Sequence, residues 1–335
     1  MNNDFANSGV NHDSTHLDVN SGSAQLNVNH GSTPTVRSLL AAVHAVLSRS
    51  AEYDEFSTEH SQSERDRESR EILSALMNVR PGDVSRASDS SVDDLLVQRA
   101  LAAAERRATG EPLAYCVGTA AFRHLVLHVD SRVLIPRPET EIVVDQALRM
   151  VAQSPGGIAV DIGTGSGAIA LSLATEGRFD RVIATDISSD ALAVASANAE
   201  HIGGQFTPIE FREGADFEPL SGIKARVIVS NPPYISADER SSLPASVREW
   251  EPALALFAEQ GGMARYDALL AGATVHLENG GWLVLEVDSR RAQETARRAR
   301  LDGRYSAVRL VRDFAGRERV LVAQYNSSAN VVPAQ

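Results

Sequence analysis

The chain has 335 residues, of which 43% are hydrophobic and 23% charged, and its formal net charge is −12. This length can bury a substantial core, and the composition is ordinary for a globular protein. The acidic balance argues against a protein that binds nucleic acid mainly through phosphates, because such binding needs a positive surface.

The single cysteine, Cys116, excludes an internal disulfide and a cysteine-rich metal site, and the nine histidines are scattered, so we expect no metal ion. No apolar stretch reaches the length of a membrane span, and the N-terminus lacks the basic-then-apolar form of a signal peptide. We therefore expect a cytoplasmic protein that binds neither membrane nor, directly, nucleic acid. We also expect a monomer.

The N-terminal third predicts a tail followed by helices. Residues 1–35 are rich in Asn, Ser, Gly and His and contain no Lys or Arg, which predicts a disordered tail. Apolar residues then recur at helical spacing, and the region 36–109 predicts a small helical domain. Its polar insert, 51–70, is expected to be a solvated loop or a helix extension. Ser91 is expected to cap the last helix, whose arginines, Arg107 among them, are interpreted as a solvated face.

The remainder alternates strand and helix. Strands are expected near 158–162, 181–186, 207–212, 226–230, 281–287, 305–312 and 318–325, and helices near 167–177, 189–202, 263–278 and 289–301. Strands interleaved with helices predict parallel pairing in a doubly wound α/β sheet. The last two strands have only a short connection and should form an antiparallel hairpin. The region 142–325 is thus expected to be one Rossmann-like domain, with a disordered tail at 326–335.

A glycine turn follows the first of these strands: Gly163-Thr164-Gly165-Ser166-Gly167. Glycine permits positive φ and close approach of a ligand, and the helix that starts here offers free N–H groups. The spacing is G-x-G-x-G and therefore differs from the G-x-G-x-x-G of dinucleotide-binding proteins.

An acidic residue, Asp186, ends the next strand, one βαβ step later. A carboxylate at this point can accept hydrogen bonds from both hydroxyls of a ribose. The alternative is a residue near a helix N-cap, since Ser188 and Ser189 open the next helix.

The most informative motif is Asn231-Pro232-Pro233-Tyr234, directly after the strand at 226–230. Two prolines fix two φ angles, and neither proline has an N–H, so neighbouring carbonyls are free to accept. An Asn side chain beside such a carbonyl provides two acceptors for one –NH₂ group. Because an amide or aromatic amine is a poor nucleophile, holding both its hydrogens orients it for attack. This order of signals resembles the S-adenosylmethionine-dependent methyltransferases that modify amino or amide nitrogen.

Residues 110–141 are expected to form a linker with a hairpin between the two domains, and their sequence narrows the resemblance to one family of methyltransferases. Its most specific part is Ile135-Pro136-Arg137-Pro138-Glu139-Thr140-Glu141. Together with the tetrapeptide, it resembles the release-factor glutamine methyltransferases (PrmC/HemK family) from about Val36 to Ala323. Thr140 is expected to cap the helix that follows. Arg137 and Glu139 are expected to contact substrate or to brace the site.

The resemblance implies methyl transfer from S-adenosylmethionine to the glutamine side-chain amide in the Gly-Gly-Gln motif of class 1 peptide-chain release factors. It also implies that Asn231 and the carbonyl of Pro232 hold the amide, with Pro233 and Tyr234 beside it. The released proton is expected to pass to water or Tyr234.

For the cofactor, the resemblance implies that the glycine loop and Asn231 cradle the methionine moiety. Asp186 would hold the ribose, and the stretch containing Asp216 would border the adenine. The helical domain at 36–109 would recognise the substrate protein.

Three alternatives stay open. A ribosomal-protein glutamine methyltransferase has the same tetrapeptide but usually lacks the Pro-Glu-Thr-Glu run. A DNA adenine methyltransferase could use the same elbow on a flipped base, although the acidic balance counts against it. The intact tetrapeptide disfavours the third, a non-enzymatic cofactor-binding protein.

Overall fold

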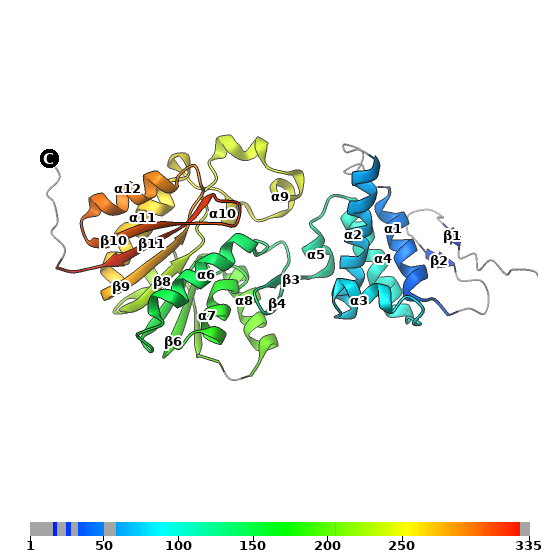
Figure 1. Ribbon diagram of the computed structural model, residues 1–335, viewed down its shortest axis with the longest axis horizontal. Helices are drawn as coiled ribbons and strands as arrows, with labels where there is room; N and C mark the ends of the chain where they lie inside the picture. The colour runs from blue at the N-terminus through cyan, green and yellow to red at the C-terminus, as the bar shows by residue number, and fades with distance from the viewer. Residues whose placement is uncertain (1–15, 19–24, 28–32, 50–57, 205, 329–335) are drawn as a thin grey trace, which may run out of the picture. The chain divides into compact units, whose positions relative to one another are not determined.

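The computed structural model describes residues 16–18, 25–27, 33–49, 58–204 and 206–328. Expectations for most of the N-terminal tail, for the start of the polar insert and for the last seven residues lie outside these ranges. The chain divides into two compact units, Met1–Val117 and Gly118–Gln335 (Figure 1). The division falls inside the predicted linker, so most of the linker belongs to the second unit. Two short strands, β1 (His16–Asp18) and β2 (Gln25–Asn27), pair antiparallel within the first unit.

Helices form the rest of the first unit, as the sequence pattern predicts. They are α1 (Val36–Leu47), α2 (Thr58–Met77), α3 (Pro81–Arg86), α4 (Asp94–Ala108) and α5 (Leu113–Val117). Leu39 and Val43 on α1 and Ile72 and Leu73 on α2 are fully buried in one apolar cluster. The i, i+4 spacing of Leu39 and Val43 places both on one face of α1, and this face packs in the same apolar cluster as Ile72 and Leu73.

The helix ends differ from the sequence expectation. Thr35, assigned to the tail, caps α1 by exchanging hydrogen bonds with Ser38. The N-cap of α4 is Asp93, whose carboxylate accepts from the N–H of Leu96 at 2.7 Å, rather than Ser91. Ser91 instead forms a β-bridge with Thr35. The tertiary contact between these segments therefore selects the cap.

A buried ion pair corrects the interpretation of the last helix as a solvated face. Arg107 on α4 donates from Nε to Oε2 of Glu68 on α2 at 2.9 Å, and the two side chains are only 10% and 7% exposed. Glu68 belongs to the polar insert, of which Thr58 onward is part of α2. Breaking such a pair leaves an uncompensated buried charge, so the insert contributes to the structure of this unit.

The second unit is built on a seven-stranded sheet with the order β10-β11-β9-β8-β5-β6-β7. The strands are β5 (Ile158–Ile162), β6 (Arg181–Asp186), β7 (Ile209–Glu213), β8 (Ala225–Ser230), β9 (Leu277–Glu286), β10 (Tyr305–Arg312) and β11 (Glu318–Tyr325). Strands β5 to β9 pair in parallel, and β11 pairs antiparallel with both β9 and β10. The predicted strands, the parallel pairing and the closing hairpin are confirmed.

Helices cover both faces of this sheet (Figure 1). On one face lie α6 (Pro138–Val151), α7 (Ala168–Glu176) and α8 (Ser189–Ile202), and on the other lie α11 (Ala264–His276) and α12 (Ala292–Asp302). Val182 and Val229 point into the first layer, whereas Ile183 and Ile228 point into the second. Because both strand faces are buried, the strands read as continuous apolar runs.

The linker at 110–141 was expected to contain a hairpin, whereas the short helices described below did not stand out from the sequence. A hairpin of β3 (Thr119–Phe122) and β4 (Leu125–His128) packs Phe122 and Leu127 into the layer of α6 and α7. Short helices follow the tetrapeptide: η3 (Ala237–Ser242), α9 (Ala245–Trp250), α10 (Ala253–Leu256) and η4 (Gln260–Gly262). Another, η2 (Glu218–Leu220), follows β7. All of these helices span six residues or fewer, which is too short for an apolar period, so the local sequence pattern does not reveal them.

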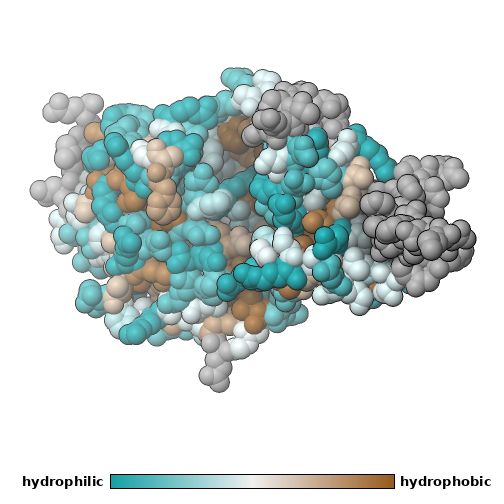
Figure 2. Space-filling model, turned by 45° about the vertical axis from the view of Figure 1, so that its right-hand side comes forward, coloured by the Kyte–Doolittle hydropathy of each residue, from teal (hydrophilic) through white to brown (hydrophobic). Residues whose placement is uncertain are grey.

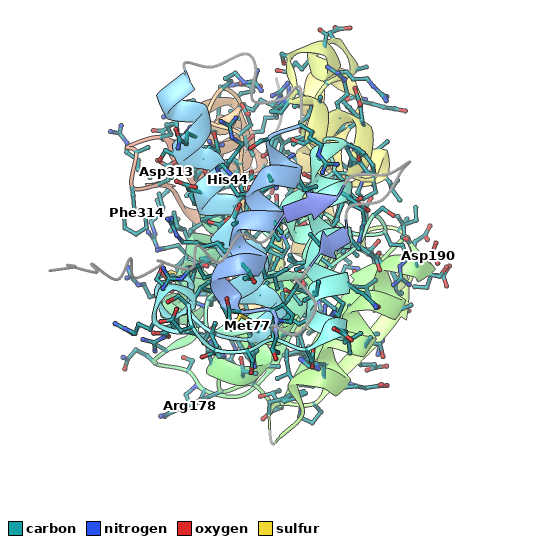
Figure 3. The ribbon with its side chains drawn as sticks, turned by 90° about the vertical axis from the view of Figure 1, so that its right-hand side faces the viewer. His44, Met77, Arg178, Asp190, Asp313 and Phe314 are labelled. Carbon is teal, nitrogen blue, oxygen red and sulfur yellow. The ribbon has the colours of Figure 1, made fainter. Side chains whose placement is uncertain are left out.

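In the described part of the chain, no helix is long and apolar enough to cross a membrane. Hydrophilic residues cover most of the face shown in Figure 2, and the hydrophobic residues there form separate patches. One apolar side chain stands apart: Phe314 is fully exposed in the turn between β10 and β11 (Figure 3). The carboxylate of Asp313 fixes this turn, since it accepts from the N–H groups of Ala315 and Arg317, both at 2.9 Å.

Candidate active site

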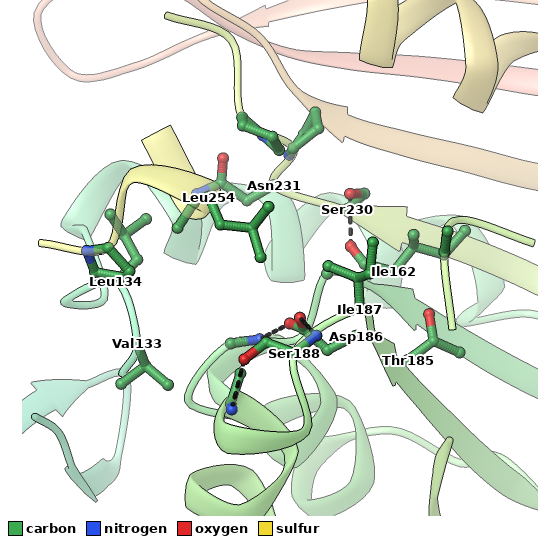
Figure 4. A pocket seen from close by; sticks show the side chains of 18 of the residues that line it. Val133, Leu134, Ile162, Thr185, Asp186, Ile187, Ser188, Ser230, Asn231 and Leu254 are labelled. Carbon is green, nitrogen blue, oxygen red and sulfur yellow. Dashed lines mark hydrogen bonds between the residues drawn. The ribbon is translucent and has the colours of Figure 1, made fainter. Parts of the chain in front are cut away.

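A cavity of about 360 Å³ lies at the carboxyl ends of β5, β6 and β8. Strand order reverses between β5 and β8, and such a switch point is where doubly wound sheets bind ligands. In Figure 4, Asn231 and Leu254 lie on one side of the cavity and Asp186 and Ser188 on the other. The predicted site residues that line it are Gly163, Gly165, Asp186, Asp216, Asn231, Pro232 and Pro233.

Backbone hydrogen bonds hold the glycine loop against β6. The N–H groups of Gly163 and Thr164 both donate to the carbonyl of Thr185 at 2.9 Å. Gly163 and Gly165 adopt φ of 73° and 55°, and a Cβ on either would meet no atom within 4 Å. The two glycines therefore present bare backbone to open space at the cavity wall.

The other residues of the loop, Thr164, Ser166 and Gly167, do not line the cavity and instead contact the residues that hold the loop in place. Thr164 and Ser166 are buried, and the hydroxyl of Thr164 donates to Asp161 Oδ2 at 2.7 Å. The carbonyl of Ser166 accepts from Asn198 at 2.9 Å. Gly167, with φ of 84°, is the N-cap of α7. The Thr164 hydroxyl, the Ser166 carbonyl and the Gly167 backbone thus have structural roles in the loop.

Asp161, the fourth residue of β5, is a site-supporting residue that sequence reasoning missed. Its Oδ2 also accepts from the N–H of Ala170 at 3.1 Å, whereas its Oδ1 has no hydrogen-bond partner within the described residues. Complete burial raises the pKa of this carboxyl to about 7. The side chain therefore ties the loop to the first turn of α7. In the sequence, the indication of this role was an acidic residue within an otherwise apolar strand.

Asp186 has a dual role. Its Oδ2 accepts from the N–H of Gly165 and its Oδ1 from the N–H of Ser188, each at 2.9 Å. Ser188 is the N-cap of α8, so Asp186 also lies near a helix N-cap, as the alternative expected, although it is not the cap itself. The carboxylate lies at the cavity wall and at the same time fixes the glycine loop.

Asp216 lines the cavity but its carboxylate is engaged. Both oxygens accept from Nη1 of Arg265 on α11 at 2.9 Å, and the residue adopts a positive φ of 46°. Arg265 lines the cavity too. The positive φ turns the chain after β7 towards the opening, and the ion pair holds this turn in place.

The tetrapeptide follows β8 as predicted. Asn231 donates from Nδ2 to Oγ1 of Thr140 at 3.2 Å. Across the described residues, neither Oδ1 of Asn231 nor the carbonyl of Pro232 accepts a hydrogen bond. Two neighbouring acceptors therefore remain available at the cavity, as the sequence suggested.

Tyr234 is half-buried and packs against the apolar layer that contains α11. Gly262 allows this approach, since a Cβ there would lie 2.1 Å from the carbonyl of Tyr234. Burial raises the pKa of Tyr234 to about 12. The phenol is therefore neutral at neutral pH and a very weak base, which favours water over Tyr234 as the acceptor of the released proton.

Thr140 and Glu286 form a pair that sequence reasoning missed. The helix starts at Pro138 with Arg137 as its N-cap, so Thr140 lies in the first turn and is not the cap. Its hydroxyl donates to Oε2 of Glu286, at the end of β9, at 2.6 Å. Both side chains are buried, and burial raises the pKa of Glu286 to about 7. In the sequence, the indications of this pair were a Thr within the linker motif and a Glu at the end of an apolar strand.

Arg137 and Glu139 do not line the cavity. Arg137 pairs with the buried carboxylate of Glu251, which also accepts from the N–H of Ile135 at 3.3 Å. Glu139 lies 3.6 Å from Nη2 of Arg317. Of the two roles expected for Arg137, the structure supports bracing, because the pair joins the linker to the short helices that follow the tetrapeptide.

The doubly wound sheet, with a glycine loop and an Asn-Pro-Pro-Tyr elbow on one cavity, defines an α/β methyltransferase. Residues 143–248 match the family model described as Methyltransferase small domain, and residues 54–118 match PrmC N-terminal domain. The chain belongs to the release factor glutamine methyltransferase family, as its relatives show.

One relative is the Release factor glutamine methyltransferase of Moorella thermoacetica, 42% identical over 221 residues, which are 66% of this chain and 77% of that protein. Another is that of Yersinia pestis, 44% identical over 222 residues, which are 66% of this chain and 78% of that protein. Among solved structures, the hMettl16 catalytic domain in complex with MAT2A 3′UTR hairpin 1 superposes with a TM-score of 0.50 and 16% identity. The match covers 79% of this chain and 95% of that one and shows a shared fold.

Proposed function

We propose that this chain transfers a methyl group from S-adenosylmethionine to the side-chain amide nitrogen of a glutamine. The substrate is the Gly-Gly-Gln motif of class 1 peptide-chain release factors. Membership of the family supports this substrate, and the geometry of the cavity supports the chemistry.

The observation that carries the proposal is the orientation of Asn231. Because Nδ2 is bound to Thr140, Oδ1 is the free end of the amide, and it lies one residue from the free carbonyl of Pro232. A primary amide has two N–H donors, which match these two acceptors. Holding both hydrogens orients the nitrogen and withdraws it from conjugation with its own carbonyl, so its lone pair becomes nucleophilic.

The size and lining of the cavity support the binding of a small-molecule cofactor. Its volume lies in the range of roughly 300–1,000 Å³ for small-molecule sites. In the proposal, the bare backbone of Gly163 and Gly165 approaches the methionine moiety, Asp186 accepts from the ribose, and the turn at Asp216 borders the adenine. When bound, S-adenosylmethionine supplies an electrophilic methyl group. The methylated amide nitrogen is strongly acidic and releases its proton to water, so no side-chain base is needed.

Recognition of an intact release factor is a further part of the proposal. Remote contacts would supply the binding energy that positions the glutamine, and the helical unit is the proposed source. On this basis a short Gly-Gly-Gln peptide should have a much lower kcat/KM than the whole factor. Equal values would locate recognition in the tetrapeptide pocket alone. The cytoplasm, the monomeric state and the lack of direct nucleic-acid binding stay predictions.

The test is methyl transfer from labelled cofactor to a purified class 1 release factor, with the label mapped by mass spectrometry. We expect label on the glutamine of Gly-Gly-Gln, reduced to a small residual rate in Asn231→Ala and retained in the control Asn279→Ala. Asn279 is exposed, and among the described residues its Oδ1 accepts only from Ser327. Cofactor binding should persist in Asn231→Ala. Label on a ribosomal protein or on DNA adenine, with none on the release factor, would instead select one of the two alternative activities.

A further inference from the structure

Asn231 can serve as an acceptor only if its side-chain amide is held in one of two orientations. A rotation of 180° about its last bond exchanges Oδ1 and Nδ2, which have nearly the same shape. In the rotated state an –NH₂ group would face the –NH₂ group of the substrate, and neither could accept. Something in the site must therefore distinguish the two ends of this amide.

The hydrogen-bond chain behind Asn231 provides this distinction. Glu286 as a carboxylate can only accept, so the single hydroxyl proton of Thr140 points to Glu286 Oε2 at 2.6 Å. Towards Asn231 the same oxygen then offers only a lone pair, and it accepts from Nδ2 at 3.2 Å. The donors and acceptors of this hydrogen-bond chain therefore have one fixed arrangement: the Asn231 amide donates to Thr140, and the Thr140 hydroxyl donates to Glu286.

Burial makes this order rigid. Thr140 is 4% exposed and Glu286 is 3% exposed, so water does not compete for either hydrogen bond. The residues come from three separate elements, α6, the end of β9 and the elbow after β8. The chain of hydrogen bonds fixes the linker motif, the sheet edge and the elbow in one arrangement.

We propose that Thr140 and Glu286 are positioning residues that set the orientation of the Asn231 amide and thereby select an –NH₂ group as the substrate group that is methylated. This inference rests on the proposed function. It assigns to the Thr of the linker motif and to the Glu at the end of β9 a role in kcat rather than in cofactor binding.

A protonated Glu286 would no longer specify the direction of the chain, because a carboxylic acid can donate as well as accept. Burial and the neighbouring Glu139 raise its pKa, whereas the hydrogen bond from Thr140 and the charges of Arg319 and Arg137 lower it. Among the described residues, the titratable groups that act on Glu286 come from four places. They are Arg137 and Glu139 at the N-terminus of α6, Arg319 on β11, Tyr234 after β8 and Tyr266 on α11. With a resulting pKa of about 7, kcat should rise with pH through this value.

The experiment compares Thr140→Val, Thr140→Ser and a matched control, Thr274→Val. Thr274 is equally buried at 4% exposure, and its hydroxyl donates to the carbonyl of Ala271 on its own helix. We expect Thr140→Val to lower kcat by roughly 10²-fold, with KM for the release factor and the cofactor Kd little changed. Thr140→Ser should restore most of the rate, and Thr274→Val should leave it unchanged.

A double-mutant cycle with Asn231→Ala separates positioning from a general structural role. If Thr140 acts through Asn231, Thr140→Val should have no further effect once Asn231 is absent. Glu286→Gln should lower kcat and remove the rise with pH near 7. A readout independent of turnover is the side-chain amide NMR signal of Asn231, assigned by its loss in Asn231→Ala. This signal should shift with pH near 7 in the wild type and not in Glu286→Gln.

Three outcomes would overturn the inference: full kcat in Thr140→Val, equal losses in kcat and cofactor affinity, or additive losses in the double mutant. An inactive wild-type chain would instead refute the proposed function. In that case the NMR titration still decides whether Glu286 and Thr140 orient the Asn231 amide.

Discussion

Two glycines of the same loop should respond in opposite ways to the same substitution, to alanine. A Cβ on Gly167 would lie 2.9 Å from Cδ1 of Leu171 and 3.2 Å from Cβ of Ala195. A Cβ on Gly165 would meet nothing within 4 Å. Gly165 lines the cavity, whereas Gly167 packs between α7 and α8. Gly167→Ala should therefore damage stability and Gly165→Ala should damage cofactor binding.

The magnitudes follow from backbone strain and overpacking. Positive φ costs alanine about 1–2 kcal/mol at either position, and the loss of unfolded-state freedom returns about 0.4–1 kcal/mol. Overpacking adds about 1–3 kcal/mol at Gly167 alone. The free energy of unfolding should thus fall by about 2–4 kcal/mol in Gly167→Ala and by about 1 kcal/mol in Gly165→Ala. At roughly 2–4 °C per kcal/mol, the larger loss lowers Tm by roughly 4–16 °C.

Chemical and thermal unfolding measure the first effect, and calorimetric titration with S-adenosylmethionine measures the second. We expect Gly167→Ala to bind cofactor with near-normal Kd below its Tm, and Gly165→Ala to bind at least tenfold more weakly. The reasoning fails if Gly165→Ala binds normally, because the loop would then not be the cofactor contact. It also fails if Gly167→Ala unfolds like the wild type, since the close packing with Ala195 would then have no energetic consequence.

Three further predictions concern other parts of the chain. Asp186→Ala should weaken cofactor binding by about 1–3 kcal/mol, the range for a hydrogen bond to a charged group, and an unchanged Kd by calorimetry would reassign the ribose carboxylate. The raised pKa of Glu286, about 7 against an ordinary 4.5, favours the protonated form in the folded state. This stabilisation is complete below pH 4.5 and is lost as pH rises through 7. The free energy of unfolding should therefore fall with pH by up to about 1.4 kcal/mol per pH unit in this range. Urea titrations at several pH values measure this slope, which should be flatter in Glu286→Gln. Deleting residues 1–32 should leave Tm and turnover unaltered. The deletion keeps the Thr35 cap and the carbonyl of Pro34, which accepts a hydrogen bond from the N–H of Val92. A clear drop in Tm or turnover would show that the tail has a structural role.

Much of the catalytic unit was readable from the sequence because its signals are local. An apolar run such as 226–230 is buried on both faces in a parallel sheet, so its pattern alone marks the strand and its end. Parallel pairing brings the carboxyl ends of these strands to the same edge of the sheet. The sequence alone therefore predicts that the glycine loop and Asn231 belong to one site, and both line the cavity. The family resemblance rests on these same local motifs.

What only the tertiary structure decided is which polar side chains meet. Thr140 contacts Asn231 and Glu286, which are 91 and 146 residues away along the chain. From the sequence alone, a Thr near the start of a helix is equally suited to cap that helix, so these contacts could not be predicted. In the same way, Arg107 was indistinguishable from a solvated residue until α2 placed Glu68 beside it, 39 residues earlier. Residue type fixes what a polar group can donate or accept. Only the packing of distant elements decides which partner it finds and whether water can compete.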